Sequence, residues 1–170
     1  MGGDFPRKGG FDLIETWRAG GFHERADLEI VTDWELPPPL PPGVTVTRNV
    51  PAHSAKWRAC WAAADAFVMP TRNEAFGLVY QEAAAAGVPA IGTTHNAIPE
   101  IVIDGETGLL VPVGDRRALA AAMHALLESA ELRCRLGVRA RQRIETIASP
   151  DIYMERLTAI LTTAARSRTT

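Results

Sequence analysis

The sequence predicts an α/β fold in which one parallel sheet is doubly wound, with helices on both faces. Short strand-like segments alternate along the chain with segments of helical periodicity, an order typical of parallel sheets with helical crossovers. Each strand-like segment is a near-continuous apolar run, which indicates burial on both faces. The 170 residues suffice for one domain with a hydrophobic core and are too few for two of ordinary size.

Helices are predicted where apolar residues recur every three or four positions. Residues 11–19 carry Phe11, Ile14 and Trp17 on one face and stop at Gly20-Gly21, a pair that favours a helix end. The other helical segments repeat this pattern or are rich in alanine; in chain order they span residues 54–64, 78–86, 98–102, from 116 onward, 131–147 and 151–164. Residues 166–170 are expected to be frayed.

Strands are predicted where short apolar runs lie between turn residues. These runs span, in chain order, residues 28–32, 44–50, 66–69, 88–91 and 108–111. The proline-rich stretch at 37–42 is expected to form a stiff surface connection between the first two strands. Asp104-Gly105 is expected to be a structural turn, because Asp-Gly suits a positive φ.

Composition narrows the function class. A hydrophobic content of 46% and a net charge of −2 fit an ordinary globular protein without the basic excess that attracts nucleic acid. Cys60 and Cys134 lack zinc-site or disulfide spacing and are expected to be reduced, buried thiols. No apolar run reaches the roughly 18 residues of a membrane span and the N-terminus lacks signal-peptide features, so the cytoplasm is the expected compartment.

Two glutamates, Glu74 and Glu82, contrast with their surroundings. Between residues 75 and 99, Glu82 is the only Asp, Glu, Lys or Arg. A carboxylate in an apolar stretch is costly to bury without a hydrogen-bonding partner. It is therefore either solvated at an edge or placed for a polar ligand.

The loop between the third predicted strand and the next helix holds Glu74. In doubly wound sheets, ligands bind outside the carboxyl ends of the strands, and a helix N-terminus offers unpaired N–H groups to a phosphate. The backbone of Phe76, Gly77 and Leu78 suits that role, while Glu82 can accept two hydrogen bonds from a vicinal diol such as a ribose. The alternative is that Glu74 caps the helix and Glu82 is solvated.

A second loop, residues 2–10, combines glycines with Lys8, and the chain has only one other lysine. Glycines and a lysine ahead of a helix can bind an anion, although this spacing matches neither the P-loop motif nor the G-x-G-x-x-G dinucleotide-binding motif. The alternative is a flexible turn with a solvated lysine. His95 could reach the same edge of the sheet or be incidental, and Trp57 and Trp61 are expected in the core or on an exposed interaction face.

Together these segments resemble the C-terminal, nucleotide-binding domain of family 4 retaining glycosyltransferases of the GT-B type. The resemblance runs from residue 2 to about residue 147. It rests on an ordered series of motifs: ADAFVMP (64–70), EAFGL (74–78) leading to EA (82–83), AGVP (86–89), IPEIV (98–102) and GETGLLV (105–111). It implies a Rossmann-like domain over residues 1–150, with a truncated first strand, followed by a C-terminal helix and tail at 151–170.

The resemblance also implies roles at matching positions. Glu82 would bind the ribose hydroxyls of a nucleoside diphosphate sugar, and the backbone of residues 76–78 would hold sugar or diphosphate oxygens. Glu74 would contact the transferred sugar near its anomeric carbon and Lys8 would neutralise the departing diphosphate, which makes these two the expected catalytic residues. No cofactor or metal is expected. Catalysis would be electrostatic, with attack on an oxocarbenium-like sugar from the face that the diphosphate leaves.

Three features depart from the family. Gly3 occupies the position of a common arginine, and Arg7 could replace that arginine in binding the diphosphate. Asn96-Ala97 replaces the usual Gly-Gly pair, which would stiffen the loop around the donor sugar. The N-terminal, acceptor-binding domain is absent from this chain, so we expect a fragment that binds nucleotide sugar and does not transfer it alone.

The predicted function is therefore that of the donor-binding half of a hexosyltransferase of carbohydrate biosynthesis. The expected partners are a nucleotide sugar and the N-terminal domain, with no nucleic acid; the full-length protein could associate peripherally with a membrane. Two alternatives remain open: a non-catalytic nucleotide-sugar-binding module that pairs with a separate chain, and a GT-B-type sugar-nucleotide epimerase. The sequence specifies neither the base, nor the sugar, nor the acceptor.

Overall fold

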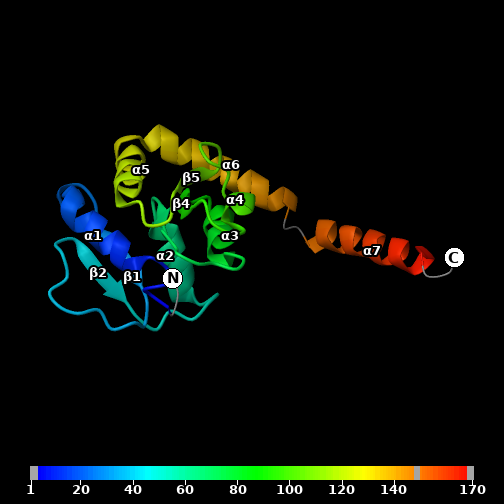
Figure 1. Ribbon diagram of the computed structural model, residues 1–170, viewed down its shortest axis with the longest axis horizontal. Coiled ribbons are helices and arrows are strands. Elements are labelled where there is room, and N and C mark those ends of the chain that lie inside the picture. Colours follow the sequence, from blue (N-terminus) through cyan, green and yellow to red (C-terminus); the bar gives the residue numbers. More distant parts are fainter. Residues whose placement is uncertain (1–3, 148–149, 168–170) are drawn as a thin grey trace.

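The computed structural model describes residues 4–147 and 150–167, and Figure 1 shows an α/β body from which one helix projects. The helices are α1 (Gly10–Gly20), the 3-10 helix η1 (Phe22–Glu24), α2 (Ala55–Ala63), α3 (Leu78–Ala85), α4 (Ile98–Ile101), α5 (Arg116–Glu128), α6 (Ala130–Ile147) and α7 (Pro150–Ser167). The strands are β1 (Leu28–Val31), β2 (Val44–Thr47), β3 (Phe67–Val68), β4 (Ala90–Thr93) and β5 (Gly108–Val111).

Every strand pair in the described part of the chain is parallel, as expected for strands joined by helical crossovers. β1 pairs with β2, and β4 lies between β3 and β5. The predicted α/β class with parallel strands is confirmed, but the described strands form two sheets where the sequence predicted one. Helix α1 connects them, because Ile14 packs on Ile30 of β1 while α1 also packs against α5.

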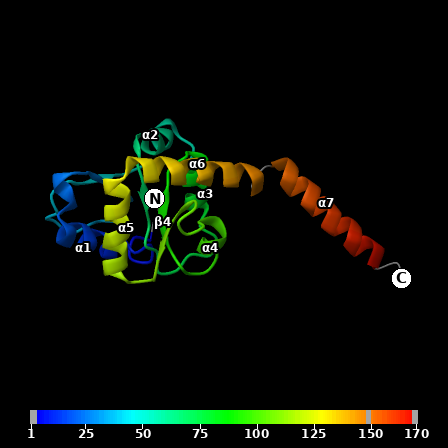
Figure 2. The ribbon, with the colours of Figure 1, turned by 90° about the horizontal axis from the view of Figure 1, so that it is seen from above.

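The largest buried cluster fills the space between α1, α5 and the three-stranded sheet. Leu13 and Trp17 of α1 pack there with Ile91 of β4, Val111 of β5 and Leu119 of α5. Figure 2 shows α5 between α1 and β4. The helical stripe that the sequence predicts from residue 116 onward is therefore a core face.

A second cluster lies at the carboxyl end of β3. Met69, Tyr80 and Ile98 are buried together, so the segment after β3 packs on both α3 and α4. The Tyr80 hydroxyl donates to the Met69 carbonyl over 2.5 Å, and the Thr93 hydroxyl donates to the Thr71 carbonyl over 2.9 Å. These buried bonds fix the start of the loop that holds Glu74.

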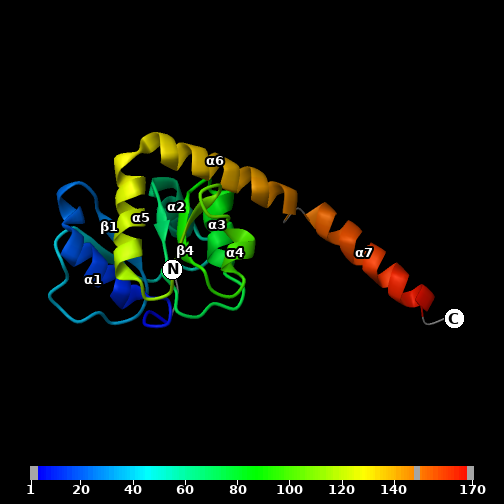
Figure 3. The same cartoon turned by 45° about the horizontal axis from the view of Figure 1, so that its top comes forward.

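Helix α6 crosses the outer side of α3, as Figure 3 shows. The close approach depends on Gly137, where a Cβ would lie 2.1 Å from the carbonyl oxygen of Gly87. No other residue type fits that contact without moving the backbone. Helix α6 is thereby held against the turn that follows α3.

Several predicted boundaries are wrong by a few residues. The strand predicted at 88–91 is β4 at Ala90–Thr93, because Val88 is bonded back to the end of α3: its amide donates to the Ala83 carbonyl over 2.9 Å. The strands predicted at 44–50 and 66–69 are shorter, as β2 and β3. β2 ends before Asn49, where a φ of 53° turns the chain.

The C-terminal helix also extends beyond its predicted end. α7 continues to Ser167, so the expectation of fraying at residues 166 and 167 is wrong, and residues 168–170 lie outside the described part. α7 projects from the body beyond α6 (Figures 1 and 2) and exposes Met154, Ile160 and Leu161. None of the helices in the described ranges is both long and apolar enough to cross a bilayer.

The two cysteines are free, as predicted, but they are not both buried. Cys60 is half-buried, and burial raises the pKa of its thiol. Cys134 is exposed on α6, because Leu136 and Ala140 are the residues that this helix turns toward the core. Trp61 is buried and Trp57 packs beside it, which confirms the core interpretation of this pair.

Candidate functional site

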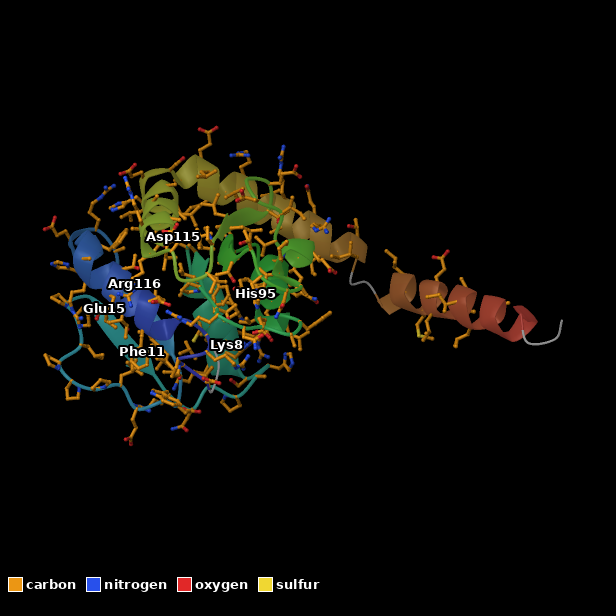
Figure 4. All side chains as sticks on the ribbon, in the orientation of Figure 1. Lys8, Phe11, Glu15, His95, Asp115 and Arg116 are labelled. Atoms are coloured by element: carbon orange, nitrogen blue, oxygen red, sulfur yellow. The ribbon has the colours of Figure 1, made fainter. Side chains whose placement is uncertain are left out.

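The candidate site lies where the carboxyl ends of β3 and β4 meet the loop ahead of α1. The loop after β3, residues 71–77, carries Glu74 and is called the Glu74 loop below. Figure 4 shows Lys8 between α1 and the elements that follow the Glu74 loop. The Arg72 amide donates to the Arg7 carbonyl over 2.9 Å, so the two loops are joined through their backbones.

Lys8 and Glu74 form an ion pair between Nζ and Oε2. Their side chains are only 18% and 12% exposed, so the pair is largely removed from water. Burial by itself would raise the pKa of Glu74, but the hydrogen bond and charge of Lys8 and the backbone amides of Gly77 and Phe76 together outweigh it. The pKa of Glu74 is therefore lowered, and the carboxylate is ionised at neutral pH.

The backbone ahead of α3 takes part in the same cluster. Gly77 has a φ of 76° and forms the N-cap of α3, with no side chain closing the helix end. The amides of Phe76 and Gly77 act on the Glu74 carboxylate, so they already face an anionic group. Phe76 and Leu78, on either side of Gly77 in the chain, expose their side chains, at 57% and 62%.

Glu82 lies apart from this cluster, on the second turn of α3. Its side chain is half-buried, and no hydrogen bond or ion pair joins it to another residue in the described part of the chain. The structure thus brings Glu74 together with Lys8 but does not bring Glu82 into contact with either. Both the ligand-binding and the solvated interpretations of Glu82 are compatible with this position.

Arg7 has different partners from those of Lys8. Its guanidinium bonds to Asp4 Oδ2 through Nε over 3.0 Å and to the Asn73 carbonyl over 2.8 Å. The backbone amide and side chain of Arg7 also lower the pKa of Asp4. In this arrangement Arg7 ties the N-terminal loop to the Glu74 loop, and the expectation that it contacts a diphosphate remains a prediction.

A buried ion cluster that no sequence motif indicated lies beside the site. Asp12, in the first turn of α1, has a side chain only 4% exposed and pairs with Arg72 Nη2 over 2.7 Å and with Arg116 Nε over 2.9 Å. Arg72 belongs to the Glu74 loop and Arg116 starts α5. Since these residues are distant in sequence and match no motif, only the fold could identify the cluster.

Asn96 is a second residue whose contacts the sequence did not reveal. It follows β4 with a φ of 51°, and its side-chain amide donates to Asn73 Oδ1 over 3.1 Å and to the Glu74 carbonyl over 3.0 Å. The neighbouring His95 is half-buried on the same loop, and Figure 4 places it above Lys8 in that view. The stiff loop predicted from Asn96-Ala97 therefore has a physical basis in these two bonds.

A metal site is not evident in the same region. Within residues 4–147 and 150–167, no three His, Cys, Asp or Glu side chains are grouped to hold a metal ion. The polar groups there include the Lys8 ammonium, the Glu74 carboxylate, the backbone N–H groups ahead of α3 and, farther along that helix, the Glu82 carboxylate. They are suited to bind anionic oxygens and hydroxyls.

Comparison with known proteins gives a family. The model of the family described as glycosyl transferases group 1 matches residues 7–129. N-acetyl-alpha-D-glucosaminyl L-malate synthase of Bacillus anthracis is 42% identical over 83 residues, which are 49% of this chain and 22% of that enzyme. The chain thus spans less than a quarter of this curated relative.

Solved structures agree on the fold. Sucrose-phosphate synthase of Thermosynechococcus elongatus is 28% identical with a TM-score of 0.74, over 94% of this chain and 43% of that one. Anabaena HepE, solved in complex with UDP-glucose, is 18% identical with a TM-score of 0.75, over 93% and 46% of the two chains. The second likeness concerns the fold alone.

Proposed function

Because the chain belongs to the glycosyl transferases group 1 family, we propose that it binds the nucleoside diphosphate sugar that serves as donor in a retaining hexosyl transfer. The observation that carries the proposal is the convergence of Lys8, Glu74 and the amides ahead of α3. These groups supply a cation, a carboxylate and backbone donors in a partly buried site. That combination is suited to a diphosphate joined to a sugar.

The similar proteins support the same class of ligand. The name of the Bacillus anthracis relative specifies a glucosaminyl product, and HepE was solved with UDP-glucose. Both are consistent with an activated sugar as the ligand of this chain. Neither fixes its base or its sugar.

In the proposed complex Lys8 neutralises the diphosphate as it leaves. A lysine ammonium has three N–H donors, so Lys8 can hold a phosphate oxygen while it keeps its bond to Glu74. Glu74 then accepts hydrogen bonds from hydroxyls of the transferred sugar near the reacting carbon. The acceptor attacks the oxocarbenium-like sugar from the face that the diphosphate leaves, so the configuration at that carbon is retained.

Glu82 and the backbone of residues 76–78 complete the donor site in this proposal. The Glu82 side chain is half-buried at the second turn of α3, and its carboxylate has no hydrogen-bond or ion-pair partner in the described part of the chain. A ribose diol would supply the two hydrogen bonds that its carboxylate lacks. The amides ahead of α3 would shift from Glu74 to sugar or phosphate oxygens.

Calorimetry with UDP-, GDP- and ADP-glucose, and with the free diphosphates, tests the proposal. Glu82→Gln should weaken nucleotide sugar and free nucleotide alike by about 10-fold, because the ribose is common to both and a charged hydrogen bond contributes about 1.5 kcal/mol or more. Glu74→Gln should weaken the nucleotide sugar alone.

The matched control is Glu106→Gln, which changes an exposed carboxylate in the turn before β5 and should bind like the wild type. Absence of binding heat for every nucleotide and nucleotide sugar would refute the proposal and leave the family and the fold in place. Equal effects of the Glu82 and Glu106 substitutions would refute the role of Glu82.

Binding and transfer are separate parts of the proposal. We propose that the 170-residue chain binds the donor without transferring the sugar, since the acceptor would be held by another domain. Product analysis with each nucleotide sugar and a panel of acceptors checks this. Transfer by the chain alone would contradict the expectation of inactivity, whereas formation of an epimeric nucleotide sugar would favour the epimerase alternative.

A further inference from the structure

Asn96 links the loop after β4 to the Glu74 loop. Its side-chain NH₂ group donates one bond to Asn73 Oδ1 and another to the Glu74 carbonyl, over 3.1 and 3.0 Å. Only the nitrogen of the amide can donate to a carbonyl, so the contact with Glu74 fixes the orientation of the side chain. Both of its hydrogens are used.

The Glu74 loop depends on such side-chain bonds because it lies outside helices and strands. The Asn73 carbonyl accepts from Arg7 Nη1 over 2.8 Å and from the Thr71 hydroxyl over 3.1 Å. The next carbonyl, that of Glu74, accepts from Asn96. The bonds from Arg7 and Asn96 reach the loop from other segments, whereas the Thr71 hydroxyl belongs to the loop itself. From the side of β4, the Thr93 hydroxyl holds the start of the loop at the Thr71 carbonyl, and Asn96 holds the backbone at Glu74.

We propose that Asn96 is a positioning residue that fixes the backbone at Glu74 and thereby selects for the sugar part of a nucleotide sugar. The inference rests on the proposed function, in which Glu74 contacts the transferred sugar. Asn96 itself holds no reacting atom. A backbone shift at Glu74 would move its carboxylate relative to Lys8, whereas the bonds of a ribose to Glu82 on α3 would be unaffected.

The backbone conformation of Asn96 makes it possible to separate two roles: positioning Glu74 through the side-chain amide, or only allowing a left-handed turn. Asn96 has a φ of 51°, in the left-handed region that asparagine tolerates and glycine adopts at no steric cost. If Asn96 served only to allow this turn, glycine would replace it without loss. If its amide positions Glu74, glycine removes both hydrogen bonds while keeping the turn.

Two substitutions and two matched controls test the proposal in the 170-residue chain. Asn96→Gly removes the bonds, and Asn96→Asp replaces the donor with an acceptor that faces two oxygens. The controls are Asn49→Gly and Asn49→Asp, at an exposed asparagine with a φ of 53°. Far-ultraviolet circular dichroism and thermal melting confirm that all four variants fold.

The first readout is the affinity for UDP-glucose beside that for UDP, or for the GDP or ADP pair if the wild type prefers it. Asn96→Gly should weaken the nucleotide sugar about 5-fold and the free nucleotide less than about 2-fold, because one or two neutral hydrogen bonds of about 0.5–1.5 kcal/mol are lost. Asn96→Asp should weaken it further. The Asn49 variants should match the wild type.

The second readout needs no ligand. NMR titration of the Glu74 carboxyl carbon should show that Asn96→Gly raises the pKa of Glu74 toward its ordinary value, because Lys8 and the amides no longer surround it as closely. The Asn49 variants should leave it unchanged. This measurement decides the positioning role even if the wild type binds no nucleotide, in which case the proposed function fails separately.

The proposal is overturned if Asn96→Gly leaves the Glu74 titration as in the wild type, or if it weakens nucleotide sugar and nucleotide equally. The first result would restrict Asn96 to the backbone turn. Equal weakening of both ligands would show that Asn96 affects the whole binding site and not the contact with the sugar in particular. The proposal is also contradicted if the Asn49 variants lose as much affinity for the nucleotide sugar as the Asn96 variants do.

Discussion

At the scale of single residues, Lys8 and Glu74 are the groups whose energies depend most on each other. Each is charged and mostly shielded from water, and each compensates the other's loss of hydration. The amides of Gly77 and Phe76 assist Glu74 but cannot replace the positive charge. The pair therefore affects the stability of the loop as well as any ligand.

Lys8→Met should destabilise the fold by about 1.5–3 kcal/mol, the range for a hydrogen bond to a charged group, because Glu74 loses its cation while it stays largely buried. Urea unfolding at neutral pH measures the change. Lys56→Met is the matched control, at an exposed lysine that bonds only to the Arg48 carbonyl in the described structure. Equal effects of the two substitutions would show that the ion pair contributes nothing.

The lowered pKa of Glu74 predicts a pH dependence. The folded carboxyl titrates below its ordinary value of 4.5, so its ionised form stabilises the fold above about that pH. This contribution is lost as the pH falls through the lowered value. Wild type and Glu74→Gln, compared by urea unfolding from pH 7 down to pH 3, should converge on acidification. A constant difference would contradict the lowered pKa.

At the scale of elements, Asp12 joins three segments. It sits in α1, and its two arginine partners come from the Glu74 loop and from the start of α5. The arginine side chains are 54% and 51% exposed, whereas Asp12 is 4% exposed. The cost of breaking the cluster therefore depends on which charge is left behind.

Removing both arginines should cost more than removing Asp12. The double variant Arg72→Ala with Arg116→Ala leaves a buried, uncompensated carboxylate, a situation that costs about 3–5 kcal/mol. Asp12→Ala leaves two arginines that water can solvate, and should cost about 1–3 kcal/mol. Urea unfolding of both variants gives the order.

A surface pair provides the control for this comparison. Arg18→Ala breaks the exposed contact with Glu15 on the same helix and should change stability by about 1 kcal/mol or less. If Asp12→Ala proves more costly than the double arginine variant, the two arginines, and not Asp12, are the charges that need compensation.

At the scale of the whole molecule, the body and α7 differ in how they are held. The body has a continuous core from α1 through the sheet to α5 and α6, whereas α7 projects beyond α6 with apolar side chains in solvent. The domain boundary near residue 150 stays a prediction.

A chain that ends at residue 149 should therefore keep its fold and its ligand. We expect a melting temperature within about 3 °C of that of the full chain, corresponding to less than about 1 kcal/mol, and an unchanged affinity for nucleotide sugar. Thermal melting followed by calorimetry checks both. Loss of cooperative unfolding in the shortened chain would show that α7 is part of the folding unit.

Local sequence patterns predicted most helices and strands, but only some of the residues that meet at the candidate site. Helix α1 and strand β5 follow from short-range periodicity and turn residues, because the physical causes lie within a few positions. The predicted strand at 88–91 was wrong because Val88 is held by Ala83 and Trp61, contacts that the local pattern does not contain. The helix N-terminus beside Glu74 could be located from the strand-loop-helix order alone.

The sequence by itself determined the α/β class, the order of the elements and the candidate residues Lys8, Glu74 and Glu82, because hydrophobic period, glycine placement and isolated charges act locally. Only the tertiary structure decided which charges meet. It paired Lys8 with Glu74, buried Asp12 between two arginines and placed Asn96 against the Glu74 loop. Such pairings depend on how segments far apart in the sequence pack around a common core, and no local sequence pattern specifies which of their side chains come into contact.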